Sequence, residues 1–155
     1  MPKDKTFRWS EFAICKRLRG PFPAPAFIVL PQVRNGTGFQ RKTVRTADAL
    51  IVSTWPGRGL WVGGVEIKVV LHDWKREIAD PAKSEMQQWC KNWWIAAPKG
   101  LIPQAELPET WGLIECTETK AFLDGQGPAA GSEAAGYVLT GVDPARSLRQ
   151  LHTQG

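Results

Sequence analysis

The sequence has few cysteines, few histidines and no long apolar run. Its three cysteines (Cys15, Cys90 and Cys116) are odd in number and widely spaced, without a CxxC pair, and only two histidines could join them. This pattern argues against a disulfide framework and against structural zinc. No apolar stretch approaches the roughly 20 residues that span a bilayer, and the opening MPKDKTFRWSEF lacks the apolar core of a secretory signal. We therefore expect a cytoplasmic protein without membrane association.

Length and composition indicate one folded domain with a polyanionic partner. The chain has 155 residues, 43% of them hydrophobic and 23% charged, which is typical of a globular domain. The net charge of +5 is uneven, because residues 1–46 carry +8 and the remainder carries −3. Lys and Arg replace the counterions condensed on phosphate, so a basic half suits nucleic acid. The alternative is that this charge serves solubility alone.

Apolar periodicity and turn residues predict the order helix, three strands, helix, two strands, which makes an α/β or α+β domain. Asn35-Gly36 indicates a hairpin, and Gly63-Gly64 indicates a β-bulge. Asp80 and Pro81 are typical of a helix start, and an apolar stripe follows from Ala82 to Trp93. Helices are predicted over 7–18 and along the helical pattern of 72–92, within which a helix restarts at Asp80-Pro81 and its apolar stripe continues to Trp93. The predicted strands span 26–33, 47–55, 60–70, 94–97 and 111–116.

The composition changes near Leu123, where DGQGPAAGSEAAG follows. Gly-, Ala- and Ser-rich sequence is typical of a linker, and Asp143-Pro144 could start a last short helix that ends near His152. We therefore expect a folded domain over 1–122, with a basic N-terminal helix and arm. Residues 123–155 are expected to form a linker and a short C-terminal helix.

Three charged residues, Asp48, Glu66 and Lys68, interrupt runs that otherwise resemble buried strands. Glu66 and Lys68 are two residues apart, so on a strand both side chains project from the same face. A turn centred on Gly57 or Arg58 would set Asp48 opposite Glu66 or Lys68 on that face. A register slip of one residue would send Asp48 to the other face.

Two carboxylates and an ammonium on one face suit metal-assisted hydrolysis. Asp48 and Glu66, with the backbone carbonyl of Ile67, would offer hard oxygen ligands to Mg²⁺. The ion would polarise a phosphodiester and lower the pKa of its bound water. Lys68 would orient the attacking water and offset charge in the transition state. The alternative is a structural Asp–Lys–Glu bridge at the end of a sheet.

The residues Asp48 and Glu66-Ile67-Lys68, separated by a hairpin, resemble the D…(D/E)xK signature of the PD-(D/E)XK nuclease superfamily. More narrowly, residues 30–117 resemble small bacterial and phage proteins of the MmcB-like DNA-repair branch. The resemblance implies a restriction-endonuclease-like core: a helix, a three-stranded antiparallel meander, a helix and one or two further strands, in a mixed sheet flanked by helices. It also implies a metal-dependent nuclease with Asp48 and Glu66 as metal ligands and Lys68 as the catalytic lysine.

Other side chains are candidates for supporting roles. Glu11 on the first helix is a candidate third carboxylate, with a solvated helix face as the alternative. Lys83 and Gln87 are i and i+4 on the second predicted helix, opposite its apolar stripe, and are expected either to approach the site or to be ordinary surface residues. The candidate phosphate contacts, expected in loops that flank the site, are Arg34, Arg45 and Arg58.

The sequence therefore predicts a deoxyribonuclease that uses Mg²⁺ or Mn²⁺ and acts in DNA repair, recombination or phage DNA metabolism. Its DNA substrate is left open between single-stranded, duplex and branched forms, and so is a homodimer. One rival is a DNA-binding module that has the same fold but little or no cleavage. Another is an adaptor whose basic arm binds a protein.

Overall fold

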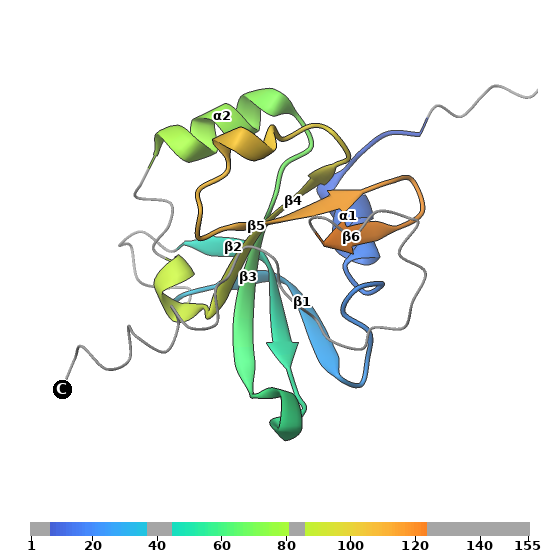
Figure 1. The fold of residues 1–155 in the computed structure, drawn as a ribbon, viewed down its shortest axis with the longest axis vertical. Helices are drawn as coiled ribbons and strands as arrows, with labels where there is room; N and C mark the ends of the chain where they lie inside the picture. Colours follow the sequence, from blue (N-terminus) through green and yellow to red (C-terminus); the bar gives the residue numbers. More distant parts are fainter. Residues whose placement is uncertain (1–6, 37–44, 81–85, 124–155) are drawn as a thin grey trace, which may run out of the picture.

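The computed structural model of the chain describes residues 7–36, 45–80 and 86–123. Within these residues, six strands form one mixed sheet in the order β1-β2-β3-β4-β5-β6, accompanied by two α-helices (Figure 1). The fold is thus of the α/β class. The strands are β1 (Phe27–Arg34), β2 (Thr46–Ser53), β3 (Trp61–Ile67), β4 (Asn92–Pro98), β5 (Gly112–Cys116) and β6 (Ala121–Leu123), and the helices are α1 (Glu11–Arg17) and α2 (Leu71–Ala79).

Helix α1 begins at a capping serine. The Ser10 Oγ accepts a hydrogen bond from the Ala13 N–H at 3.1 Å, which satisfies one of the free donors in the first turn. The helix is shorter than the predicted span of 7–18, because residues 7–10 precede it. Ile14 and Leu18 are fully buried and turn toward the sheet.

The first three strands form an antiparallel meander. β1 pairs with β2, and β2 pairs with β3 through a ladder from Ala49↔Val65 to Ser53↔Trp61. The ladder passes through Gly63 and Gly64 without interruption, so the predicted bulge is wrong. A Cβ on Gly64 would lie 2.2 Å from a ring carbon of Trp93, and one on Gly63 would lie 2.3 Å from a ring carbon of Trp94. The glycines make room for tryptophan rings of β4.

β3, β4 and β5 run parallel, and β6 returns antiparallel to β5. The predicted helix over 81–93 is wrong beyond Cys90, because β4 already begins at Asn92. Residues 86–89 form a short 3-10 turn, and residues 81–85 lie outside the described part of the chain. Trp89, expected on the apolar stripe, is 71% exposed, whereas Trp93 is buried as a strand residue. The apolar residues recur at helical spacing because a short turn is followed by a buried strand, and not because they lie on one helix.

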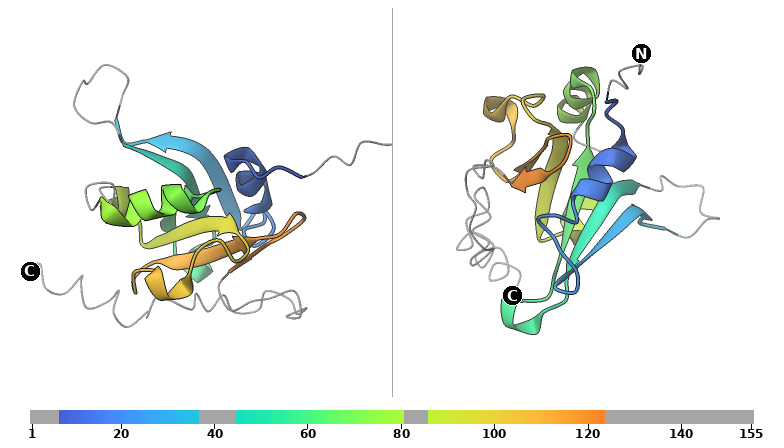
Figure 2. Two further views of the ribbon diagram at one scale, coloured as in Figure 1. Left: turned by 90° about the horizontal axis from the view of Figure 1, so that it is seen from above. Right: turned by 90° about the vertical axis from the view of Figure 1, so that its right-hand side faces the viewer.

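The two helices pack on opposite faces of the sheet (Figure 2). Alternate residues of β4 divide between the two sides. Trp94 and Ala96 belong to the core that contains Ile14 of α1, whereas Ile95 belongs to a second core with Trp74 of α2. The end of β3 lies between these two layers.

Ala121–Leu123 forms a strand that the sequence reasoning missed. Leu123 is buried on the sheet, so the predicted linker does not begin there. The remaining linker residues and the helix predicted over Asp143–His152 lie outside the described residues. Among the helices of the described ranges, none is long and apolar enough to cross a bilayer.

Candidate functional site

The structure brings Asp48, Glu66 and Lys68 to one edge of the sheet, where β3 ends. The observed ladder pairs Ala49 with Val65, and the next step of this register sets Asp48 opposite Glu66. This is the register predicted for a turn centred on Gly57. It puts both carboxylates on the same face, because side chains alternate along each strand.

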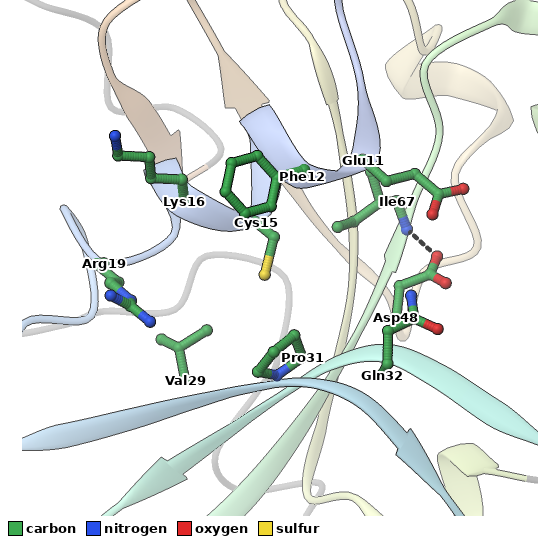
Figure 3. Close-up of a pocket in the computed structure, with 10 residues that line it drawn as sticks. All are labelled: Glu11, Phe12, Cys15, Lys16, Arg19, Val29, Pro31, Gln32, Asp48 and Ile67. Atoms are coloured by element: carbon green, nitrogen blue, oxygen red, sulfur yellow. Dashed lines mark hydrogen bonds between the residues drawn. The ribbon is translucent and has the colours of Figure 1, made fainter.

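Short contacts tie the three residues together. Asp48 Oδ2 accepts the Ile67 backbone N–H at 2.8 Å (dashed in Figure 3), so the aspartate bridges two strands where their ladder stops. The Lys68 Nζ lies 3.4 Å from Glu66 Oε2 and 2.9 Å from Oε2 of Glu77. The side chains of Lys68, Glu66 and Glu77 are only 11%, 13% and 5% exposed, so this ionic cluster is largely removed from water.

Asp48 also sits at an irregular point of the first hairpin. The ladder between β1 and β2 passes from Pro31↔Ala49 to Val33↔Ala47 and omits the intervening pair. Gln32, the residue opposite Asp48, has a φ of 53°. A non-glycine residue in the left-handed region is strained, and such strain is concentrated at functional sites.

The electrostatics of the cluster favour a neutral Glu66. Burial, followed by the charge of Asp48, raises the pKa of Glu66 to about 8; Lys68 opposes the rise, while Glu77 and a side-chain hydrogen bond with Asp48 add to it. For Lys68, burial lowers the pKa, but the hydrogen bond to Glu77 and the charges of Glu66, Glu77 and Asp48 outweigh burial and hold it above its ordinary value. Lys68 therefore stays charged, and the carboxylates outnumber it.

The donor set fits a hard cation with water in its shell. Within the part of the chain that the structure describes, no three or more His, Cys, Asp and Glu side chains are grouped to hold a metal ion. The site offers a carboxylate pair and the backbone carbonyl of Ile67, which follows Glu66 at the end of β3. Mg²⁺ is commonly held by one or two carboxylates and keeps several waters. Four-coordinate structural zinc would need more nitrogen or sulfur ligands.

Glu77 is the residue that the sequence reasoning missed. It lies on α2, three residues after Trp74, and these two are the buried residues of that helix. A charged residue on the apolar face of a helix is the signal that could have found it, since burial of a charge calls for a partner. That partner is Lys68, which begins the connection from β3 to α2.

Glu11, the candidate third carboxylate, lies at the N-terminus of α1 and is exposed. It lines the same pocket as Asp48 and Ile67, and Figure 3 shows its side chain extending toward the region of the Asp48 carboxylate. The structure therefore places Glu11 beside the site.

Two of the three predicted arginines lie at the edge of the sheet that holds the site. Arg34 ends β1 and pairs with Thr46 at the start of β2. Arg45 precedes β2, and its N–H donates to Asn35 Oδ1 at 2.9 Å, next to the end of β1. Because β1 ends, β2 begins and β3 ends at the same edge, both arginines belong to the neighbourhood of Asp48.

The other predicted contacts have different positions. Arg58 belongs to the 3-10 turn η1 (Pro56–Arg58), which joins β2 to β3 at the end of the hairpin away from Glu66, so the prediction that it flanks the site is wrong. Gln87 lies in the 86–89 turn, where its Oε1 accepts the Trp111 Nε1–H at 3.0 Å. That bond gives it a packing role. Lys83 lies outside the described residues.

No protein-family model matches the chain, and no curated protein matches it. Among solved structures, the chain is similar to the SPO1766 protein of unknown function from Silicibacter pomeroyi, with a TM-score of 0.52 and 17% sequence identity. The alignment covers 89% of this chain and 78% of that chain. At this identity the likeness concerns the fold alone.

Proposed function

We propose that this protein is a deoxyribonuclease that uses Mg²⁺ or Mn²⁺ and has a restriction-endonuclease-like core of the PD-(D/E)XK type. The observation that carries the proposal is the meeting of Asp48, Glu66 and Lys68 at one sheet edge, in the register that the motif requires. The element order helix, antiparallel meander, helix, parallel strand is the order expected for that core. A cytoplasmic role in DNA repair, recombination or phage DNA metabolism would suit this activity.

Each residue of the cluster has a defined part in this proposal. Asp48 and Glu66 would hold the cation, together with the carbonyl of Ile67, and the ion when bound would polarise the phosphodiester and acidify water. The Ile67 N–H donates a hydrogen bond to one oxygen of Asp48, and this bond sets the orientation of the other oxygen of the carboxylate. Lys68 keeps its proton and would orient the attacking water and offset the negative charge that develops on the phosphate.

The direct test is cleavage of single-stranded, duplex and branched DNA with Mg²⁺ or Mn²⁺. Wild type is compared with Asp48→Asn, Glu66→Gln and Lys68→Met, and Asp73→Asn serves as the control because its side chain is 46% exposed on α2. We expect cleavage that EDTA abolishes, that each site variant loses by about 100-fold or more, and that the control retains. Wild type that binds DNA without cutting it under any of these conditions would overturn the proposal.

A DNA-binding module without cleavage is the second candidate. The observation that favours it is the pairing of Lys68 with both Glu66 and Glu77, because the charge of Lys68 already has partners within the protein. On this alternative, the variants of Glu66 and Lys68 bind DNA as tightly as wild type, and binding is salt-sensitive. If wild type cleaves DNA, and the variants bind DNA as tightly but no longer cleave it, the result favours the nuclease over the binding module.

A further inference from the structure

A pocket of about 540 Å³ opens between α1 and β1, next to the candidate site. Phe12 and Cys15 form its wall on α1, and Val29 and Pro31 form its wall on β1 (Figure 3). The buried Ile67 side chain lies beside Asp48 at one end. The middle of the pocket is therefore mainly apolar and has a volume typical of small-ligand sites.

The charges of the pocket lie at its two ends. Lys16 and Arg19 lie on the side away from Asp48, and Glu11 lies on the Asp48 side (Figure 3). Cys15 lies between the ends: burial raises the pKa of its thiol, Arg19 lowers it and Asp48 raises it. Both ends are thus close enough to act on the same thiol.

Phe12 is a highly exposed aromatic residue at the pocket. The residue is 79% exposed, because Ile14 of α1 and the following Leu18 are the residues that pack into the core. Exposed aromatic rings beside cationic side chains are the elements with which proteins hold unpaired bases and their phosphates. An entirely apolar ligand would form no ionic contact with Arg19 or Lys16.

We infer that this pocket binds one unpaired nucleotide of a single-stranded DNA segment. On one side this nucleotide would adjoin the phosphate that lies at the Asp48 end of the pocket. The base would lie against Phe12 and the apolar walls, and its neighbouring phosphate would contact Arg19 and Lys16. A base paired in a duplex keeps its partner and its stacked neighbours, so it cannot enter between a helix and a strand. The inference rests on the proposed function, and it assigns single-stranded DNA as the substrate class.

The test measures binding without cleavage. Fluorescence anisotropy of a labelled oligothymidylate and of a labelled duplex is recorded in EDTA, for wild type, Phe12→Ala and Arg19→Ala. The matched controls are Leu60→Ala, another exposed apolar side chain at 69%, and Lys91→Ala, another exposed cation. Both controls precede the strands β3 and β4 and so lie at the other edge of the sheet.

We expect Phe12→Ala to weaken binding of the single strand by about five-fold or more, since stacking on an aromatic ring has that effect per base. Arg19→Ala should lower the slope of log K against log salt for the single strand by about 0.7, because one phosphate contact is lost. Phe12→Ala should leave duplex binding within about two-fold of wild type, and the controls should change neither. Unchanged single-strand affinity in Phe12→Ala, or an equal loss on duplex, would overturn the inference.

Cys15 provides a second readout inside the pocket. In a Cys90→Ala background, the oligothymidylate should slow alkylation of Cys15 by a small thiol reagent several-fold, and the duplex should not. An alkylation rate that the strand leaves unchanged would overturn the inference. Cys116 does not interfere, because it is fully buried.

The two proposals fail in different ways. If wild type never cleaves DNA but the pocket variants lose single-strand binding, the nuclease proposal fails and the strand-binding pocket stands. If wild type cleaves DNA and Phe12→Ala binds the single strand as wild type does, the pocket inference alone fails.

Discussion

At the scale of single residues, the candidate site has an imbalance of charge. Asp48, Glu66 and Glu77 surround one ammonium, that of Lys68, and all three act on its pKa. A buried excess of carboxylates is unfavourable unless one is protonated or a cation is bound.

The stability of the metal-free protein should decrease as pH rises. The pKa of Glu66 is about 8 in the folded chain against 4.5 for an unperturbed glutamate, so folding favours its protonated form. The stabilisation is complete below the unfolded pKa and is lost as pH rises from about 4.5 through about 8, by an amount on the order of a few kcal/mol. Urea unfolding between about pH 5 and pH 9 in EDTA measures it.

Glu66→Gln should remove most of this pH dependence, because glutamine stays neutral throughout. Added Mn²⁺ should raise the stability of wild type at alkaline pH and have little effect on Glu66→Gln, since a ligand that binds the folded state stabilises it. Asp73→Asn is the control and should follow wild type. A pH profile of Glu66→Gln that coincides with that of wild type would contradict the assignment of the proton to Glu66.

Glu77 should act as a positioning residue for Lys68. Glu77→Gln keeps the shape of the side chain but removes the charge that holds the Lys68 Nζ at 2.9 Å. If Lys68 assists hydrolysis, kcat should fall by about ten-fold or more with KM nearly unchanged, and the stability loss should be about 1–3 kcal/mol. Steady-state cleavage kinetics and urea unfolding measure the two effects.

The matched substitution Asp73→Asn, on the same helix but exposed, should change neither quantity. A loss of stability in Glu77→Gln with kcat unchanged would give Glu77 a purely structural role. The pH–rate profile separates these outcomes further, because a displaced Lys68 should shift the alkaline limb of the profile.

At the scale of elements, β3 and β4 depend on glycine facing tryptophan. Gly64→Ala would set a methyl group 2.2 Å from a ring carbon of Trp93, inside a packed sheet. Since overpacking costs about 1–3 kcal/mol and occasionally more, we expect a stability loss of at least about 2 kcal/mol by urea unfolding. Gly57→Ala is the control, because a methyl group added there would meet no atom within 4 Å and the φ of Gly57 is not positive. Equal effects of the two substitutions would contradict this account.

The strands were largely predictable from sequence, because apolar runs bounded by turn residues specify them locally. The helix over 81–93 was not, since helical spacing in a turn and a following strand gives the same pattern as an amphipathic helix. β6 was missed because three residues carry too little pattern, and its pairing with β5 is a tertiary fact. Gly63 and Gly64 leave space for tryptophan rings of β4, and β4 lies about thirty residues further along the chain, so no local pattern predicts this contact.

The candidate site was predictable as far as local rules extend. The two-residue spacing of Glu66 and Lys68 and the hairpin register determine the face that Asp48 joins. Glu77 required the docking of α2 on the sheet, which no local rule gives. Arg58 was assigned to the site from sequence proximity, although the same hairpin that brings Asp48 to Glu66 carries Arg58 to the opposite edge.

At the scale of the whole molecule, the described elements of the basic half of the sequence lie next to the candidate site and its pocket. Residues 1–46 carry a net charge of +8, and they supply α1, with Arg19 on the pocket, and β1, which ends at Arg34 beside the site edge. The acidic excess of the remaining chain includes the carboxylates that would face a cation. Cationic side chains of α1, the residues after it and β1 thus lie near a cluster that carries an excess of carboxylates.

This arrangement predicts which arginines contribute to the salt dependence of DNA binding. Arg34→Ala should weaken DNA binding about three-fold or more and reduce the slope of log K against log salt by about one, because one phosphate contact is lost. Arg58→Ala removes the same charge from the opposite edge of the sheet and should change the slope by much less. Anisotropy titrations over a series of salt concentrations measure both variants. Net charge alone would make the two substitutions equivalent, so equal slopes would show that binding responds to the total charge of the chain and not to the edge where β1, β2 and β3 meet.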